Sequence, residues 1–270
     1  MGQVIFLSIK VAMMQPTFLP WLGYFELISK ADKFIFLDDF QFVYQSFDHR
    51  NRLFVNKDFI GWLTISVDKK NGFLKPINET GIREDLKWRN KLWQTIKINY
   101  SKAPYFSAYS DILEPLIAKP QYNLAKQNIS LILAISKILE DSCNFLYSSQ
   151  ISVNGKRSVR VKNLLEKVNA DVYLAAHGSF GYMLEDGIFP LSKIEVKFQN
   201  ANLKSYDQHA STKGFVPYLS ILDALFNVGA DETKKLIDVT TDHWLSWEEM
   251  KAVSKPVSSI IGGGIALVNH

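Results

Sequence analysis

The segment from Met13 to Phe25 joins an apolar run to an amphipathic one through a turn that holds two prolines and several aromatic residues. Residues 5–14 are apolar and β-branched enough for a buried strand. Beyond the turn, apolar residues recur at helical spacing as far as Ile28, and a second apolar run follows at residues 34–37. A strand, a helix and a strand in this order normally form a crossover unit of a parallel sheet. Because such sheets bind ligands beyond the carboxyl ends of their strands, we expect the turn to lie at a binding rim.

The remainder of the chain extends this pattern. Further strands are predicted at residues 62–67, 144–148, 171–176 and 194–198, the last of them at an edge of the sheet. Residues 84–141 instead have the pattern of three successive helices. We therefore expect an α/β fold, with a mostly parallel Rossmann-like sheet flanked by helices and a helical insertion at about 84–141. We also expect one domain over residues 1–237 and an extension of unassigned role over residues 238–270.

The charge of the chain favours a small-molecule partner. Lysine and arginine number 31 against 27 aspartate and glutamate, which gives a net charge of +4 along 270 residues. Nucleic-acid binders usually concentrate their basic residues on one face, so no nucleic-acid partner is expected. A phosphorylated small substrate suits this balance, and the sequence leaves the oligomeric state open.

Several features predict a cytoplasmic protein. Cys143 is the only cysteine, which excludes disulfides within the chain and suits a reducing compartment. The N-terminus has no basic region before its hydrophobic run and no small-residue cleavage site, so a signal peptide is not expected. No apolar run approaches the ~20 residues that span a bilayer, so no membrane span is expected. One cysteine and five scattered histidines without a known ligand spacing predict no metal site.

Polar residues follow three of the predicted strands. Gln15 follows the first strand, Asp38 and Asp39 follow the second, and His177 follows the strand at residues 171–176. Carboxylates and imidazoles are the usual general bases, so Asp38, Asp39 and His177 are the catalytic candidates. A lone histidine is equally often a structural group. The loop after the histidine adds binding candidates that let a ligand approach the backbone closely, namely Gly178, Ser179 and Tyr182.

Residues 40–52 are rich in aromatic, amide and charged side chains but lack a helical period, which is typical of a functional loop. Arg50 and Arg52 flank Asn51, and in an extended chain this spacing points both guanidiniums the same way. Paired guanidiniums suit phosphate or carboxylate because each offers a bidentate fork. These three residues and Gln41 are therefore binding candidates. The alternative is a surface loop whose aromatic residues pack on the sheet and whose arginines are solvated.

The run Gly-Lys-Arg-Ser at residues 155–158 stands at the predicted start of a helix. It places Lys156, Arg157 and Ser158 beside free backbone N–H groups, which predicts an anion site. The run is not a P-loop, because the second glycine of that motif is absent upstream. Ser158 can instead serve as the N-cap of the helix.

Absent motifs narrow the predicted chemistry. The chain has no Gly-x-Ser-x-Gly elbow of α/β-hydrolases, and no Gly-x-Gly-x-x-Gly of dinucleotide-binding folds follows its first strand. The opening turn weakly resembles that of the nucleotidyltransferases, which carry His-x-Gly-His at a helix start. This chain keeps Gly23 at the matching place but has Trp21 and Tyr24 instead of the two histidines. The two aromatic residues are candidates for stacking on a ligand or for packing the helix on the sheet.

Six blocks of the chain form one recognisable series. They are residues 15–25, 31–32 with 37–39 and 41–42, 50–52, 100 with 102–106, 155–158, and 217–223 with 225–227. In this order, from about residue 11 to about residue 237, they resemble the WbqC-like family of bacterial proteins. The loop after Leu174 departs from the family's usual Ser-Gly-Pro, because Ala175, Ala176 and His177 stand there.

The resemblance implies a role in the biosynthesis of O-antigen (lipopolysaccharide) and related surface polysaccharides. From what such pathways need, we expect a transferase that passes an acyl or aminoacyl group to a nucleotide-linked amino sugar, with an acyl thioester as a candidate donor. Two alternatives are a degenerate nucleotidyltransferase-like enzyme that activates a small acid or sugar phosphate, and a non-catalytic scaffold protein of the same pathway. The binding residues that we expect are Gln15, Trp21, Tyr24, Gln41, Arg50, Asn51, Arg52, Lys156, Arg157, Ser158, Gly178, Ser179, Tyr182 and Tyr218.

Overall fold

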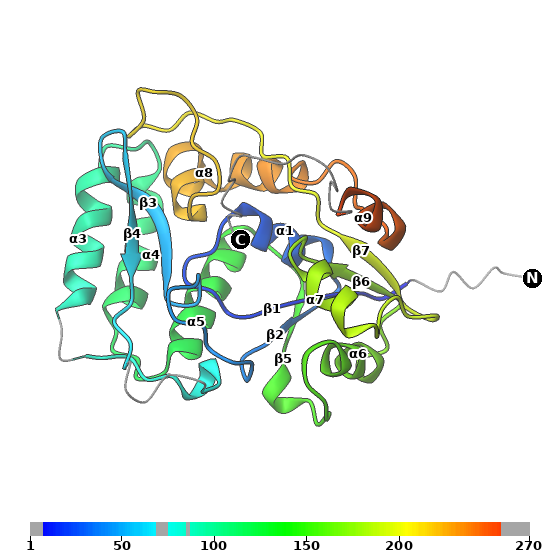
Figure 1. The fold of residues 1–270 in the computed structure, drawn as a ribbon. Coiled ribbons are helices and arrows are strands. Elements are labelled where there is room, and N and C mark those ends of the chain that lie inside the picture. The colour runs from blue at the N-terminus through cyan, green and yellow to red at the C-terminus, as the bar shows by residue number, and fades with distance from the viewer. Residues whose placement is uncertain (1–7, 69–74, 85–86, 255–270) are drawn as a thin grey trace, which may run out of the picture.

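The computed structural model describes residues 8–68, 75–84 and 87–254, and its centre is a five-stranded sheet (Figure 1). The strands lie in the order β5-β2-β1-β6-β7, and every neighbouring pair is parallel. This confirms the predicted α/β fold and the edge position of the last strand. Residues 5–7 of the first predicted strand lie outside the described residues. The bounds are β1 (Lys10–Met14), β2 (Lys33–Phe36), β5 (Asn144–Tyr147), β6 (Val172–Ala175) and β7 (Glu195–Phe198).

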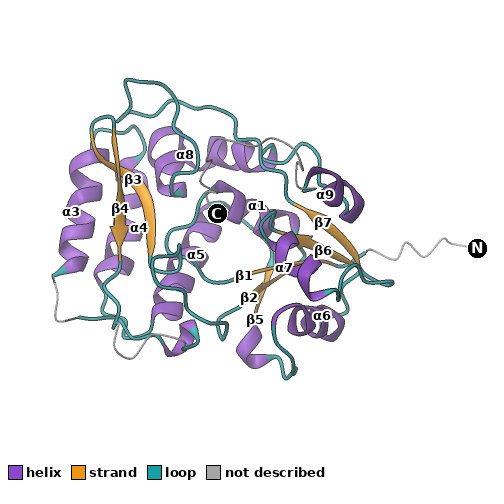
Figure 2. Cartoon of the chain, in the orientation of Figure 1, coloured by secondary structure: helices purple, strands orange, loops and turns teal. Residues whose placement is uncertain are grey.

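Helices cover both faces of this sheet (Figure 2). Successive residues of a strand point to opposite faces. Along β1, Ala12 therefore joins one hydrophobic core and Val11 and Met13 join another. The first core includes α1 (Leu22–Lys30) and α8 (Ile221–Asp238), and the second includes α6 (Arg157–Lys167), α7 (Ser179–Asp186) and α9 (Trp247–Val253).

The remaining elements form a second group beside the sheet, on the left in Figure 1. Here β3 (Arg50–Asn56) and β4 (Phe59–Thr64) form an antiparallel hairpin that packs on α3. The helices predicted within residues 84–141 are present, and residues 85–86 lie outside the described residues. The helices are α3 (Trp88–Tyr100), α4 (Phe106–Ala118) and α5 (Leu124–Ile138), and the group also contains the 3-10 turn η1 (Ile77–Glu79). A second 3-10 turn, η2 (Ser148–Gln150), directly follows β5 of the sheet.

The hairpin corrects two predictions. The strand predicted at residues 62–67 begins and ends three residues earlier, and the loop predicted at residues 40–52 ends inside β3. The inward positions of β3 include the polar Asn51, which is buried. An amide at an inward position interrupts the apolar alternation by which a strand is recognised, so the sequence pattern gave no strand signal there.

The first part of the C-terminal extension packs on the edge of the sheet. The Trp247 ring lies in a buried cluster with Phe180, Phe189 and Phe198, and Leu245 forms a bridge to Phe198 of β7. Residues 255–270 lie outside the described residues. In the part of the chain that is described, no helix has the length and apolarity to cross a membrane.

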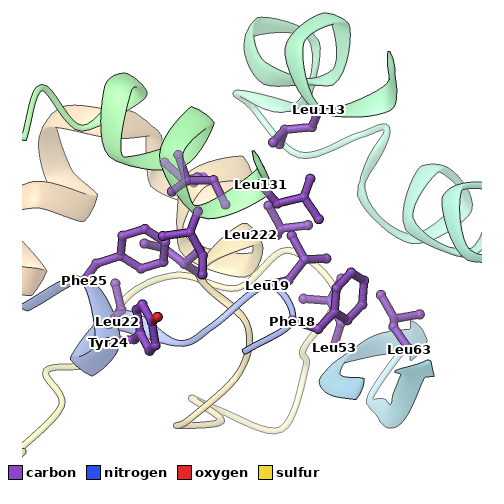
Figure 3. Close-up of a cluster of buried hydrophobic side chains, with 14 of the residues drawn as sticks. Phe18, Leu19, Leu22, Tyr24, Phe25, Leu53, Leu63, Leu113, Leu131 and Leu222 are labelled. Carbon is purple, nitrogen blue, oxygen red and sulfur yellow. The ribbon is translucent and has the colours of Figure 1, made fainter. Parts of the chain in front are cut away.

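The turn after β1 is held by the Asn51 amide. Its Nδ2 donates to the carbonyl oxygens of Phe18 (3.0 Å) and Leu19 (2.8 Å), and the Phe18 N–H donates to the Phe47 carbonyl (2.9 Å). Leu19 has a φ of 43°, which is unfavourable for a leucine. It is nevertheless buried among Leu53, Leu222 and other apolar side chains (Figure 3). Packing and the amide bonds therefore fix a backbone conformation that the turn would not adopt alone.

Asn128 of α5 holds the same turn from a second side. Its side chain is fully buried, and its Nδ2 donates to the carbonyl oxygens of Pro16 and Asp48, both at 2.7 Å. One amide thus joins the turn after β1 to the segment before β3. Because both carbonyls lie inside the protein, they depend on this donor rather than on water.

The Asn128→Ala variant leaves these two buried carbonyl oxygens without their donor. We expect the free energy of unfolding to fall by about 2–3 kcal/mol, the usual range for unsatisfied buried polar groups. Urea denaturation followed by circular dichroism measures it. The control is Asn90→Ala at an exposed position of α3, where the change should be ~0.5 kcal/mol or less. Equal values for both variants would show that Asn128 does not hold the turn.

Candidate functional site

A cavity of about 290 Å³ opens at the carboxyl end of β1. Within the sheet, β2 and β5 lie on one side of β1, whereas β6 and β7 lie on its other side. The cavity therefore lies at the topological switch point, the usual ligand site of open parallel sheets. It is lined by Met13, Met14, Gln15, Thr17, Leu37, Phe40, Arg157, Val161, Tyr173, Ser179 and Tyr182.

Four of the predicted binding residues meet in this cavity: Gln15, Arg157, Ser179 and Tyr182. They come from the turn after β1, the first residue of α6 and the first turns of α7. Gln15 is oriented by its neighbours, because its Nε2 donates to the Gln41 carbonyl (2.9 Å) and its own carbonyl accepts from the Tyr24 hydroxyl (3.1 Å). Burial raises the pKa of Tyr182, so its hydroxyl stays protonated at neutral pH and can donate.

The predicted anion site at the start of α6 is already filled by carboxylates of α7. The Ser158 N–H donates to Asp186 Oδ2 (3.1 Å), and Arg157 Nε lies 3.1 Å from Asp186 Oδ1. Arg157 Nη2 also donates to Glu185 (2.9 Å). Ser158 is not the N-cap, because Lys156 occupies that position, and the Lys156 side chain is exposed. A chain carboxylate therefore takes the place that the sequence pattern assigned to an external anion.

Asp38 and Asp39 lie beside the cavity but do not line it. Asp38 accepts from the Ser149 backbone N–H (3.0 Å) and the Ser149 hydroxyl (2.6 Å), and Ser148 Oγ lies 2.5 Å from Asp39 Oδ1. Asp39 also forms an ion pair with Arg160 of α6. These bonds attach η2 and α6 to the end of β2, and they occupy the carboxylate oxygens that a general base would use.

His177 stands just before α7, two residues from Ser179 of the cavity. Its imidazole is exposed, and its Nδ1 lies 3.2 Å from the Gln199 carbonyl oxygen. If Nδ1 carries the proton, this bond leaves Nε2 as the basic atom. Gln199 is in turn fixed, because its Nε2 donates to buried Glu26 (2.5 Å). Gly178, the N-cap residue of α7, has a φ of −64°, so its conformation does not require glycine.

Two predicted binding residues belong to the core instead. The Tyr24 ring is 1% exposed and packs on Phe25 and Phe34. The Asn51 amide is used by the turn carbonyls. The sequence pattern could not separate these positions from binding positions, because aromatic and amide residues serve both purposes.

The other candidates lie outside the cavity. The Trp21 and Tyr218 rings are 5.3 Å apart, Arg52 Nη2 donates to the Tyr218 carbonyl (3.2 Å), and Arg50 lies on the same strand face as Arg52. The Gln41 side chain is exposed. Sequence reasoning missed the other lining residues, which are apolar or isolated and carry no motif: Met13, Met14, Thr17, Leu37, Phe40, Val161 and Tyr173. Among the described residues, no three His, Cys, Asp or Glu side chains are grouped to hold a metal ion.

Comparison with known proteins gives one family. A model of the WbqC-like protein family matches residues 15–235. A relative from Mycobacterium tuberculosis (strain ATCC 25618 / H37Rv), named only as uncharacterized protein Rv1507c, is 33% identical over 223 residues, which cover 82% of this chain and 95% of the relative. No solved structure matches the chain. The match contains every candidate residue of the cavity and the hairpin.

Asp48, beside the turn after β1, makes the stability of the fold depend on pH. The residue is 3% exposed, and burial raises the pKa of its carboxyl from 3.8 to about 6, against the lowering effect of hydrogen bonds from Val43 and Ser46. The folded state therefore binds a proton more tightly than the unfolded state. The resulting stabilisation is complete below about pH 4 and is lost as the pH rises to about 6.

Asp48→Asn removes this titration but keeps an oxygen that can accept from the Val43 N–H. As the pH rises from 4 to 7, we expect the free energy of unfolding of the variant to increase by about 3 kcal/mol relative to that of the wild type. Urea denaturation at several pH values measures both proteins. The control is Asp207→Asn at an exposed site, whose curve should run parallel to the wild type. A parallel curve for Asp48→Asn would contradict the assignment.

Proposed function

The chain belongs to the WbqC-like protein family, and we propose that it is a transferase of surface polysaccharide (O-antigen) biosynthesis. In the proposed reaction, the amine of a nucleotide-linked amino sugar attacks the carbonyl carbon of an acyl or aminoacyl thioester. The bond between that carbon and sulfur breaks, the thiolate leaves, and the amine loses a proton to a general base. We also propose residues 1–237 as the functional unit and residues 238–270 as an extension.

The cavity at the switch point carries this proposal. Its apolar wall, formed by residues such as Met13, Leu37 and Val161, suits the carbon chain of an acyl group or the apolar face of a sugar. Its polar groups, the Gln15 amide and the Ser179 and Tyr182 hydroxyls, suit sugar hydroxyls, which both donate and accept hydrogen bonds. A pocket with an apolar wall and a few convergent polar groups is the default arrangement of a small-molecule site.

Of the three catalytic candidates, we propose His177 as the general base. Asp38 and Asp39 are engaged by Ser148, Ser149 and Arg160. His177 is exposed and stands two residues before the cavity residue Ser179, and the Gln199 carbonyl orients its ring. An imidazole oriented through Nδ1 is suited to accept a proton from an amine at Nε2.

Ligand binding tests the proposed substrate class. We expect a nucleotide-linked amino sugar to raise the melting temperature, because it binds the folded state alone. Ser179→Leu should fill the cavity and weaken binding at least tenfold by calorimetry, whereas Ser107→Leu, at an exposed site on α4, should not. Product is then sought by mass spectrometry with a panel of acyl thioesters. No binding and no product across the panel would overturn the proposal, and pyrophosphate release with a nucleoside triphosphate would favour the nucleotidyltransferase-like alternative.

The His177→Ala variant tests the proposed base. We expect kcat to fall about a hundredfold or more, because general-base catalysis typically contributes that much. The Kd for the nucleotide-linked sugar should change less than about twofold, since the histidine does not line the cavity. His209→Ala, at an exposed histidine elsewhere, should keep the wild-type rate. An unchanged kcat in His177→Ala would rule the histidine out as the base.

A further inference from the structure

One open face of the β3–β4 hairpin carries two arginines and a tryptophan. Arg52 stands opposite Trp62 in the strand register, and Arg50, two residues earlier, lies on the same face. The Arg50 guanidinium lies 4.1 Å from the centre of the Trp62 ring, and the indole is 45% exposed. Arg52 reaches Tyr218, whose ring contacts Trp21. We call this group, Arg50, Arg52, Trp62, Tyr218 and Trp21, the arginine ledge.

The charge of the ledge is not neutralised within the described part of the chain. Arg89, Arg157 and Arg160 each form an ion pair with a carboxylate. For Arg50 and Arg52, the acceptors among the described residues are backbone carbonyls, those of Gln45 and Tyr218 respectively. Nε of each of the two ledge arginines has no acceptor there. Two adjacent guanidiniums without a counter-ion attract an anion, and their remaining N–H groups can bind it.

The ledge arginines are held in place before any ligand arrives. Stacking on Trp62 fixes the plane of the Arg50 guanidinium. Gln45 and Tyr218, whose carbonyls accept from the two arginines, have φ values of 64° and 60°. Non-glycine residues seldom adopt such values, and they are concentrated at binding sites where the surroundings enforce them. Preorganised side chains lose less entropy when they bind.

The cavity and the ledge are joined by the turn after β1. Thr17 lines the cavity, the Phe18 N–H donates to the Phe47 carbonyl (2.9 Å), and the Phe47 ring packs on Trp62 at 5.7 Å. The cavity, at about 290 Å³, is at the lower limit of pockets that enclose a whole ligand of drug size. It can enclose a sugar but not a sugar together with a nucleoside diphosphate, so the larger part must lie outside it.

We propose that the arginine ledge binds the nucleoside diphosphate part of the substrate while the cavity holds the sugar. This proposal rests on the proposed function. The two guanidiniums bind the diphosphate oxygens. The exposed aromatic surface of Trp62 stacks with the base. This arrangement places the phosphates on the hairpin and not at the start of α6, where Glu185 and Asp186 already neutralise Arg157.

The test uses calorimetry of the full chain with UDP, dTDP and GDP, with inorganic pyrophosphate, and with UDP-N-acetylglucosamine. We expect the double variant Arg50→Gln/Arg52→Gln to bind the nucleoside diphosphates and pyrophosphate at least tenfold more weakly than the wild type. The matched control is Lys57→Gln/Lys213→Gln, which removes the same charge from exposed sites near the hairpin and should change binding less than about twofold. An equal loss in both double variants would show general electrostatic attraction and overturn the ledge.

Trp62→Leu separates stacking from charge. We expect it to weaken nucleoside diphosphate binding about fivefold or more and to weaken pyrophosphate binding less, because both ligands lose the support of Arg50 by the indole but only the nucleoside diphosphates also lose a stacking surface for the base. This variant also carries the test if circular dichroism shows that the double arginine variant is unfolded. Unchanged binding of the nucleoside diphosphates to Trp62→Leu would contradict base stacking on the ledge.

Ser179→Leu distinguishes failure of the ledge from failure of the proposed function. We expect it to weaken the binding of UDP-N-acetylglucosamine but not the binding of UDP. If Ser179→Leu weakens UDP and the ledge variants do not, the diphosphate lies in the cavity and the ledge is overturned, while the proposed function stands. If the sugar nucleotide binds the wild type and the free diphosphates do not, the ledge is likewise overturned. If no compound binds the wild type, both proposals fail.

Discussion

Two buried amides fix the arrangement of the binding region. A turn that leaves a parallel strand has no ladder partner for its carbonyls, yet the turn after β1 lies inside the protein. Asn51 and Asn128 supply the missing donors from positions 33 and 112 residues along the chain from the residues that they bind. The same amides bring β3 and α5 against the carboxyl end of β1. The sheet, the hairpin and the helical region therefore meet at one short turn, and the cavity and the arginine ledge lie at its two ends.

The hydrophobic pattern of the chain was sufficient to predict the sheet. Strands of a sheet covered on both faces are continuous apolar runs, and those at β1, β2 and β6 are short and clear, whereas the edge strand β7 shows apolar and charged residues in alternation. The rim prediction was equally direct, since Gln15 must follow β1 wherever β1 lies. Patterns of this kind are local, so they can be recognised without knowledge of the tertiary structure.

The contents of the site were harder to predict, because they depend on contacts between distant segments. The Gly-Lys-Arg-Ser run has the composition of an anion site, but Asp186, 28 residues further on, occupies it. Tyr24 and Trp21 are both aromatic residues of the opening turn and helix, but only Trp21 is partly exposed. The indole of Trp62 meets Arg50 only because the hairpin register pairs their strands. Composition shows which groups are present, whereas the fold decides which of them are already satisfied.

The carboxylates of α7 that hold Arg157 join two helices that both line the cavity. Arg157 and Val161 of α6 and Ser179 and Tyr182 of α7 are lining residues. The pair between Arg157 and Glu185 is exposed to solvent, at 57% and 72% of the two side chains. Exposed pairs weaken as dissolved ions screen them, over a Debye length of about 8 Å at physiological ionic strength. Dissolved ions therefore weaken the contact of Arg157 with Glu185, and they screen its contact with Asp186 less, because the Asp186 side chain is only 19% exposed.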